Sequence, residues 1–242
     1  MLRISMIGLA LVAGSAAAQT TFFGEDINPN PGASGIVTTL TNTRAAQSSF
    51  NNALAGNSTE SFESFGVGAT PPLGLSFTGS AGTITADLSG TGSVQSTAGN
   101  AFGRAATDGN NYFETIATSS AATSFTITFG SPVAAFGFVG TDLGDFGSTV
   151  SLDLTNGGTT NVPIPTAAGT PNGSALFFGV IAAPGQDFLS ITFNISASTG
   201  AADVFGFDEM TVGDRSQVVI PLPTGAGLAG LGLLAVGARR RR

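Results

Sequence analysis

Glycine-rich turns recur at short intervals through this chain, and the segments between them alternate apolar with polar residues. In Ser124–Phe129, phenylalanine and isoleucine take every second position and serine and threonine the others, and Leu189–Asn194 repeats the pattern. A two-residue period places one face of a strand against a core and the other in solvent. About ten such segments in 242 residues predict an all-β fold, an antiparallel β-sandwich of jelly-roll type.

One helix is expected before these strands, from Asn42 or Thr43 as the capping residue to about Ala55. The 19 phenylalanines fall mostly on strand faces, which favours core packing over ligand binding. Residues from Thr21 to Pro31 are expected to be extended chain and turn. The predicted strands are Ser61–Phe65, Leu73–Phe77, Gly82–Leu88, Tyr112–Ile116, Ser124–Phe129, Val133–Val139, Thr149–Leu154, Leu176–Ile181, Phe188–Ile195 and Phe205–Val212.

Several kinds of chemistry are excluded by residues that the chain lacks. It contains no cysteine, histidine or lysine, so thiol or imidazole catalysis, thiolate or imidazole metal sites, disulfides and Schiff bases are all excluded. Five of its eight arginines lie at the two ends, and the body keeps Arg44, Arg104 and Arg215 against 15 acidic residues. Such a body repels phosphate backbones, so no nucleic-acid partner is expected.

The first 18 residues have the pattern of a secretory signal peptide. Arg3 supplies the positive charge, Ile4–Ala13 the apolar stretch, and three alanines ending at Ala18 the small residues of a cleavage site. We therefore expect cleavage between Ala18 and Gln19 and export from the cytoplasm.

The last 25 residues, 218–242, have the pattern of a membrane segment followed by a stop-transfer charge. Val218–Ala238 is uncharged and as a helix would be about 32 Å long, just enough to cross a bilayer. Four arginines follow and should stay inside: Arg239, Arg240, Arg241 and Arg242. Pro221 and Pro223 keep the outer end extended, which suits the groove of a processing enzyme. The alternative is an ordinary membrane anchor that is never cut.

This tail resembles the PEP-CTERM class of sorting signals, and its motif is similar to the VPLPA-CTERM variant. The motif residues are Ile220, Pro221, Leu222, Pro223 and Thr224. Ile220 and Thr224 depart conservatively from that variant. The resemblance implies a Gram-negative exported protein whose partner is an exosortase, a membrane transpeptidase that removes the tail. It implies a transient stay in the inner membrane, then delivery to the cell surface or to an extracellular polysaccharide matrix.

The body is similar to secreted β-sandwich domains commonly found ahead of such tails. The matching stretches are Phe23–Asp26, Ser61–Glu63, Ala135–Phe146 and Phe205–Met210. These domains mostly have no assigned activity. The chain thus divides into a signal peptide (1–18), a secreted β-sandwich domain (19–213), a polar hinge (214–217) and a C-terminal sorting signal (218–242).

Acidic residues in turns and in the last strand raise the question of calcium. If Met210 faces inward, Asp208 should do so too, and a buried carboxylate is costly unless it is paired or bound to a metal. Carboxylate oxygens are the ligands that Ca²⁺ prefers. We therefore expect one structural Ca²⁺ drawn from Asp142, Asp145, Asp208, Glu209 or Glu63, the alternative being that these acids cap turns through backbone amides. No cofactor is required.

For function, the sequence favours a non-catalytic surface or matrix component. The alternative is a carbohydrate-binding module for exopolysaccharide, although tryptophan is absent and Tyr112 is the one tyrosine available for stacking on sugars. A glycosidase comes third, because acidic pairs such as Glu60 with Glu63 are common in loops and carry no specificity. No catalytic residue is assigned.

Overall fold

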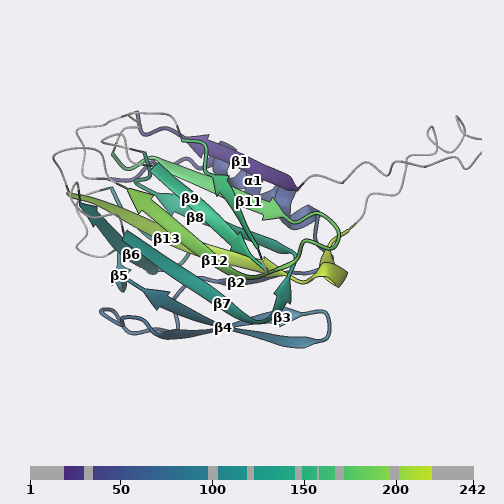
Figure 1. The fold of residues 1–242 in the computed structure, drawn as a ribbon. Coiled ribbons are helices and arrows are strands. Elements are labelled where there is room, and N and C mark those ends of the chain that lie inside the picture. Colours follow the sequence, from purple (N-terminus) through teal and green to yellow (C-terminus); the bar gives the residue numbers. More distant parts are fainter. Residues whose placement is uncertain are drawn as a thin grey trace, which may run out of the picture.

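Two antiparallel β-sheets packed face to face make up the body of the protein in the computed structural model (Figure 1). The structure describes residues 19–29, 35–97, 103–118, 123–144, 149–156, 158–166, 172–196 and 202–219. The elements are β1 (Thr20–Asp26), α1 (Thr41–Asn52), β2 (Ser58–Glu60), β3 (Leu73–Gly79), β4 (Gly82–Gly90), β5 (Ser93–Ser96), β6 (Asn111–Thr118), β7 (Thr123–Val133), β8 (Ala135–Thr141), β9 (Thr149–Thr155), β10 (Thr159–Pro163), β11 (Ala175–Ile181), β12 (Phe188–Ser196), β13 (Ala202–Gly213) and the 3-10 helix η2 (Arg215–Gln217).

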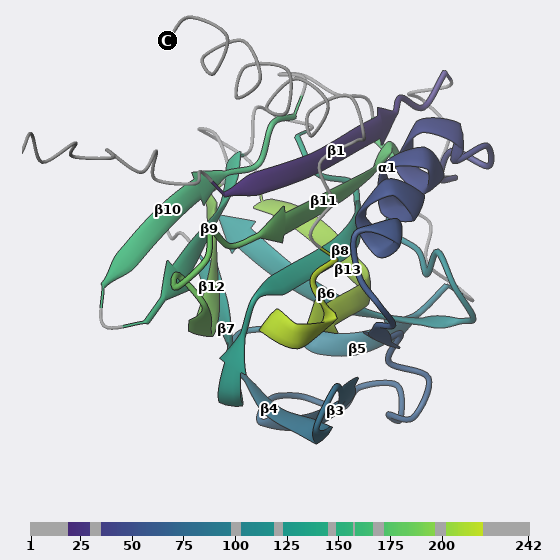
Figure 2. The same cartoon turned by 90° about the vertical axis from the view of Figure 1, so that its right-hand side faces the viewer.

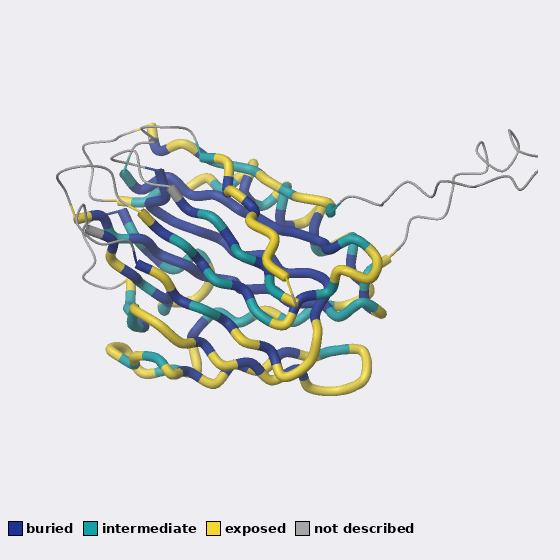
Figure 3. Tube along the Cα trace, viewed as in Figure 1, coloured by how far each residue is buried: buried dark blue, intermediate teal, exposed yellow. Residues whose placement is uncertain are grey.

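The first sheet has the strand order β1-β11-β8-β13-β6-β5, with β2 paired to β13, and the second has the order β10-β9-β12-β7-β4-β3. Along β4 and β7 the residues alternate between buried and exposed, whereas β8 and β11 are buried throughout (Figure 3). The second sheet therefore has one solvated face, while the first sheet is covered on both sides at β8 and β11. The two-sheet antiparallel sandwich predicted from the sequence is confirmed, and its jelly-roll type stays a prediction.

The core between the sheets is built from phenylalanine. The Phe125 and Phe193 rings stack with centroids 4.2 Å apart, and Phe207 meets both edge-on. All three side chains are almost fully buried. Aromatic pairs of this kind contribute about 0.5–1.5 kcal/mol beyond the area they bury, so the predicted core role of the phenylalanines is confirmed.

The helix α1 packs against β1 and β11 on the outer side of the first sheet (Figure 2). Phe50 anchors it, with ring centroids 5.5 Å from those of Phe22 and Phe177. The helix is confirmed, but the expected cap is wrong, because no helix side chain caps its first turn. Instead, the Asp26 carboxylate at the end of β1 accepts the amides of Asn42 (3.1 Å) and Thr43 (2.8 Å).

The predicted strands recur with shifted ends, apart from Ser61–Phe65. There Phe62 has a φ of 62° and its carbonyl accepts the Phe65 amide, so the segment is a turn. Strands β2, β5 and β10 were not predicted, and only extended chain was expected where β1 pairs with β11.

A β-bulge in β13 corrects the expected direction of Asp208. The pairing of β13 with β8 shifts register between Asp208 and Thr211, and Glu209 has a φ of 49°. The extra residue lets Phe207 and Met210 both face the core. Asp208 therefore lies on the opposite face from Met210, where loop residues cover it, and the prediction that both face inward is wrong.

Candidate functional site

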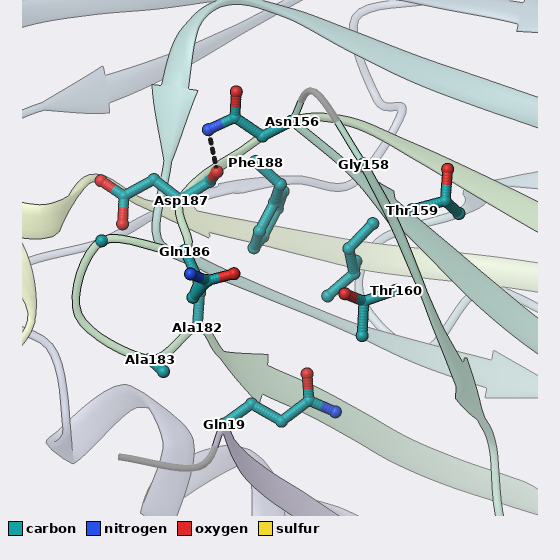
Figure 4. Close-up of a pocket in the computed structure, with 12 residues that line it drawn as sticks. Gln19, Asn156, Gly158, Thr159, Thr160, Ala182, Ala183, Gln186, Asp187 and Phe188 are labelled. Carbon is teal, nitrogen blue, oxygen red and sulfur yellow. Dashed lines mark hydrogen bonds between the residues drawn. The ribbon is translucent and has the colours of Figure 1, made fainter. Parts of the chain in front are cut away.

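A hollow of about 410 Å³ opens between the two sheets, beside the start of β1 (Figure 4). The β9–β10 hairpin borders it on one side, and the loop that joins β11 to β12 borders it on another. Side chains of Gln19, Asn156, Thr160 and Gln186 surround the space in Figure 4. Its lining consists of Gln19, Leu154, Asn156, Gly158, Thr159, Thr160, Ala182, Ala183, Gly185, Gln186, Asp187 and Phe188.

A tight turn presents Gln186 to the hollow. The Gln186 amide donates to the Ala183 carbonyl at 2.9 Å, and Gly185 has a φ of 79°. Proline followed by glycine at the two central positions is the sequence typical of a type II turn, because proline presets the first φ and glycine accepts the positive second one. The local sequence Ala-Pro-Gly-Gln thus fixes this part of the wall.

Arg215 holds the same loop from outside. Its guanidinium donates to the carbonyls of Ala182 and Ala183 at 2.9 Å, and its Nε donates to the Asp187 carboxylate at 2.8 Å. Charge-assisted bonds from one planar group to three acceptors leave the loop few alternative conformations. The wall of the hollow is therefore preformed.

The β9–β10 hairpin is tied to this loop by Asn156. Its side-chain amide donates to the Asp187 carbonyl, which Figure 4 marks with a dashed line. Thr160, at the start of β10, lies on the same face of the strand as the buried Val162 and brings a hydroxyl group to the rim. The hairpin belongs to the second sheet and the loop follows a strand of the first, so the hollow is fixed by contacts across both sheets.

The chemistry of the lining is neutral and polar. Amide and hydroxyl side chains both donate and accept hydrogen bonds, and the apolar residues of the lining, Leu154, Ala182 and Phe188, are almost fully buried. Asp187 is the one acidic residue of the lining, and it forms a salt bridge with Arg215. Such a site can bind an uncharged ligand rich in hydroxyl groups. These residues were not predicted from the sequence; the Pro184-Gly185 turn was the signal that could have indicated the loop.

The predicted calcium ligands Asp208 and Glu209 are neighbours in the bulge, and the Thr107 hydroxyl is 3.1 Å from the first carboxylate and 2.7 Å from the second. The Asp208 carboxylate accepts the amides of Thr107 (2.7 Å) and Asp108 (3.0 Å). Glu209 pairs with Arg44 at 2.6 Å and accepts the Gln47 amide at 2.7 Å. Burial raises the pKa of Asp208 to about 7, against the lowering effect of its hydrogen bonds.

Glu63 and Asp142 are each bound to backbone amides elsewhere. Glu63 accepts the amides of Asn110 and Asn111, both at 2.6 Å, and Asp142 accepts the amide of Gly173 at 2.8 Å. Burial raises the pKa of Asp142 to about 7. Asp145 lies outside the described residues.

Among the residues that the structure describes, no three acidic side chains lie close enough together to form a metal site. Asp208, Glu63 and Asp142 accept backbone amides, as predicted by the alternative to calcium, whereas Glu209 is bound by the side chains of Arg44 and Gln47. Calcium stays a prediction, and a melting temperature that rises on adding CaCl₂ is the result that would support it.

Most of the predicted export and sorting signals fall outside the described residues. This holds for Ala18, for the motif residues Ile220–Thr224 and for the four terminal arginines Arg239–Arg242. Gln19, the expected first residue after cleavage, lines the hollow. In the described part of the chain, no helix is both long and apolar enough to span a membrane.

The segment expected to be a polar hinge is the 3-10 helix η2, bonded to the body. Asp214 and Gln217 form a reciprocal capping box. The Gln217 side-chain amide also donates to the carbonyls of Gly56 (3.0 Å) and Thr78 (3.3 Å). Beyond it, the Val219 amide donates to the Ala53 carbonyl at 2.9 Å. The structured body therefore continues to at least Val219.

No family model and no curated protein matches this sequence. Solved structures with some similarity include the K2 cleaved adhesin domain of Lys-gingipain, at 11% identity and a TM-score of 0.41, over 65% of this chain and 99% of that one. A second is the carbohydrate-binding module TmCBM61 in complex with beta-1,4-galactotriose, at 14% identity and a TM-score of 0.34, over 63% of this chain and 92% of that one.

A third is the enzymatically active domain of tailspike protein 4 from bacteriophage CBA120. It is 19% identical, with a TM-score of 0.34, over 54% of this chain and 19% of that one. At these scores the three structures do not indicate the function of this chain.

Proposed function

We propose that the protein is an exported, non-catalytic β-sandwich that binds a neutral carbohydrate in the hollow beside β1 and serves at the cell surface or in an extracellular matrix. The observation that carries this proposal is the lining of the hollow. Uncharged amide and hydroxyl side chains surround a space of about 410 Å³, and one arginine holds the wall in place.

The size of the hollow limits the ligand to a short piece of glycan. Small-molecule sites commonly measure about 300–1,000 Å³, and this one is at the lower end. The Phe188 side chain is 1% exposed, so it does not offer a ring for stacking on a sugar. Recognition then depends on a few neutral hydrogen bonds of about 1 kcal/mol each, which corresponds to weak affinity, roughly millimolar.

The charge of the body favours a neutral ligand over an anionic one. Three arginines stand against 15 acids in the body, and the described arginines are each paired with a carboxylate. An acidic polysaccharide would therefore be repelled. Hydrolysis is less well supported than binding, because a glycosidase needs two carboxyl groups and the lining of the hollow contains Asp187 alone.

Binding is tested with the full chain and immobilised neutral polysaccharides: dextran, galactan, mannan and cellulose. We expect retention on at least one of them, and release by the corresponding free oligosaccharide. Gln186→Ala and Thr160→Val should each weaken retention about three- to tenfold, because each removes a hydrogen-bonding group from the hollow. Asn52→Ala is the matched control, since Asn52 is an exposed amide at the end of α1.

Equal retention of Gln186→Ala, Thr160→Val and the parent protein would show that the hollow is not the site. Retention on alginate, an acidic polysaccharide, in preference to all four neutral ones would contradict the charge argument.

The second part of the proposal is delivery to the cell surface. The observation that supports it is the tail motif and not the hollow. We expect the protein recovered from a host with an exosortase to begin at Gln19 and to end near Pro223. Intact mass measurement of the medium and membrane fractions tests this. A chain that still ends at Arg242 in the membrane fraction would make the tail a permanent anchor.

A further inference from the structure

The solvent side of the second sheet carries a continuous row of polar side chains. Its strands β10, β9, β12 and β7 lie side by side, and β4 follows (Figure 2). The registers place Asn161 opposite Asp153, Asp153 opposite Thr192, and Thr192 opposite Thr126, which in turn is opposite Ser89. We call these five residues the polar row. Neighbouring strands are about 4.8 Å apart, so the row is roughly 19 Å long.

The side chains of this row hold one another in place. The Asp153 carboxylate accepts the side-chain amide of Asn161 at 2.7 Å, and that of Asn194, on the same face of β12, at 2.8 Å. The hydroxyls of Thr126 and Thr192 are 2.9 Å apart. Because each asparagine directs its NH₂ group to Asp153, its carbonyl oxygen is left as an acceptor. The polar row is therefore an ordered array of hydrogen-bonding groups.

The composition of the row indicates what can bind to it. It contains no cation and no aromatic or large aliphatic side chain, and its one carboxylate already accepts two amide donors. Interfaces between proteins usually depend on buried aromatic or arginine anchors, and this row has none. A polyanion would meet Asp153 and the acidic body. An extended neutral polymer with many hydroxyl groups is the partner whose chemistry matches the row.

We infer that the polar row is a second contact surface for the neutral polysaccharide of the proposed function, on which this inference rests. The hollow accepts a short unit, and the row contacts a longer stretch of the same polymer or of a neighbouring chain. Two weak contacts on one rigid body bind a polymer more tightly than either contact alone. The protein should therefore prefer long polysaccharides to their short fragments.

The test compares polymers with trisaccharides, using the full chain, affinity electrophoresis for the polymers and titration calorimetry for the fragments. The probes are dextran, galactan and mannan with their trisaccharides. The double variant Thr126→Val with Thr192→Val keeps the branched shape and removes two hydroxyls. We expect it to weaken polymer binding about tenfold and to leave trisaccharide binding unchanged. Gln186→Ala should weaken both.

A matched control is the double variant Thr78→Val with Thr83→Val. These two threonines are also opposite one another and exposed, but they lie in the β3–β4 hairpin at the far edge of the sheet. It should bind the polymers as the parent does. Unchanged melting temperatures would establish that all variants are folded.

Three outcomes would overturn the inference. If Thr126→Val/Thr192→Val binds the polymers as the parent does, the polar row is not a contact surface. The hollow and the proposed function are then unaffected. A changed oligomeric mass of this variant in light scattering would make the row an interface between copies of the chain. Absence of binding by the parent to every polymer and every trisaccharide would remove the proposed function, and the row with it.

Discussion

Arg215 and Asp187 form a salt bridge that joins the last turn of the folded body to the wall of the hollow. The two side chains are 32% and 24% exposed, and the same guanidinium also binds two carbonyls of the loop. Arg215 belongs to η2, directly before the segment expected to carry the sorting signal. The segment that precedes the tail is thus bonded directly to the wall of the candidate binding site, although the two partners are 28 residues apart in the sequence.

Replacing Arg215 by glutamine should loosen the hollow and destabilise the fold. The variant loses the charge-assisted bonds to Asp187 and to the carbonyls of Ala182 and Ala183, of which the Ala183 carbonyl keeps the Gln186 amide as a donor. Because the pair is partly exposed, we expect the free energy of unfolding to fall by roughly 1–2 kcal/mol. Urea denaturation measures the stability, and retention on the polysaccharide selected with the parent measures the site. Asn52→Ala should change neither the stability nor the retention. Full retention by Arg215→Gln would show that Arg215 is not needed to hold the wall of the hollow.

Gly24 allows α1 to lie directly on β1, and alanine at this position should separate them. An added Cβ would be 2.2 Å from the Asn42 carbonyl oxygen, which is backbone and cannot rotate away. We expect Gly24→Ala to lower the free energy of unfolding by about 1–3 kcal/mol through overpacking. Gly74→Ala is the matched control, because that strand glycine has no atom within 4 Å of its added Cβ. Equal melting temperatures for the two variants would contradict the close approach.

The strands were predictable where a two-residue period was strong, as in Ser124–Phe129. They were missed where the sequence lacked apolar alternation: β10 contains one buried hydrophobic residue, Val162. The Asp26 cap on α1 could not be predicted, because it depends on a contact made only after β1 and the helix have docked. Long-range hydrogen bonds of this kind leave no local signal in a sequence.

The candidate site was harder to predict than the fold. Glutamine, asparagine and threonine in loops are common, and only the pairing of the two sheets brings Asn156 and Gln186 to one hollow. The acidic residues were predicted as site residues instead. The β-bulge, which no sequence pattern indicated, places Asp208 on the face away from the core. Charged residues are conspicuous in a sequence with few of them, whereas an uncharged site is visible only in three dimensions.

The partly buried ion pair between Arg44 and Glu209 should be costly to break from one side. Glu209 is held at a β-bulge by Arg44 and Gln47, and its side chain is 10% exposed. Arg44→Met would leave that carboxylate without its positive partner. Since the arginine itself is 38% exposed, water can replace part of the lost interaction. We therefore expect a loss of about 2–3 kcal/mol, below the upper range for buried pairs.

Equilibrium denaturation in urea measures this loss. The double variant Arg44→Met with Glu209→Gln should recover part of it, because the uncompensated charge is removed as well. A double variant less stable than Arg44→Met alone would show that Glu209 stabilises the fold independently of the arginine.

Two buried carboxyl groups should make the protein more stable in mild acid than at neutral pH. Burial raises the pKa of Asp142 and of Asp208 to about 7 in the folded state, whereas an unfolded aspartate titrates near 3.9. Between about pH 4 and 7 the folded chain therefore holds protons that the unfolded chain has lost. The free energy of unfolding must then fall as the pH rises through this window.

Asp214 affects the free energy of unfolding at a lower pH than the two buried aspartates do. Partial burial alone would raise its pKa, but hydrogen bonds from Ser80, Ser216 and Gln217 hold the pKa below its ordinary value. A lowered pKa contributes stability that is lost only as the pH falls below about 4. Glu60, whose pKa burial raises, acts in the same direction as the two buried aspartates.

Denaturation at pH 4.5, 6 and 8 tests the pH dependence. We expect the parent to lose stability across this series, most steeply between about pH 5 and 6 and with a flattening above pH 7. Asp208→Asn and Asp142→Asn each remove one titrating group and should each flatten the curve. Asp87→Asn, at an exposed carboxylate on β4, is the matched control. Stability that increases from pH 4.5 to 8 would mean that the two aspartates are ionised in the folded protein, held by the amides of Gly173, Thr107 and Asp108.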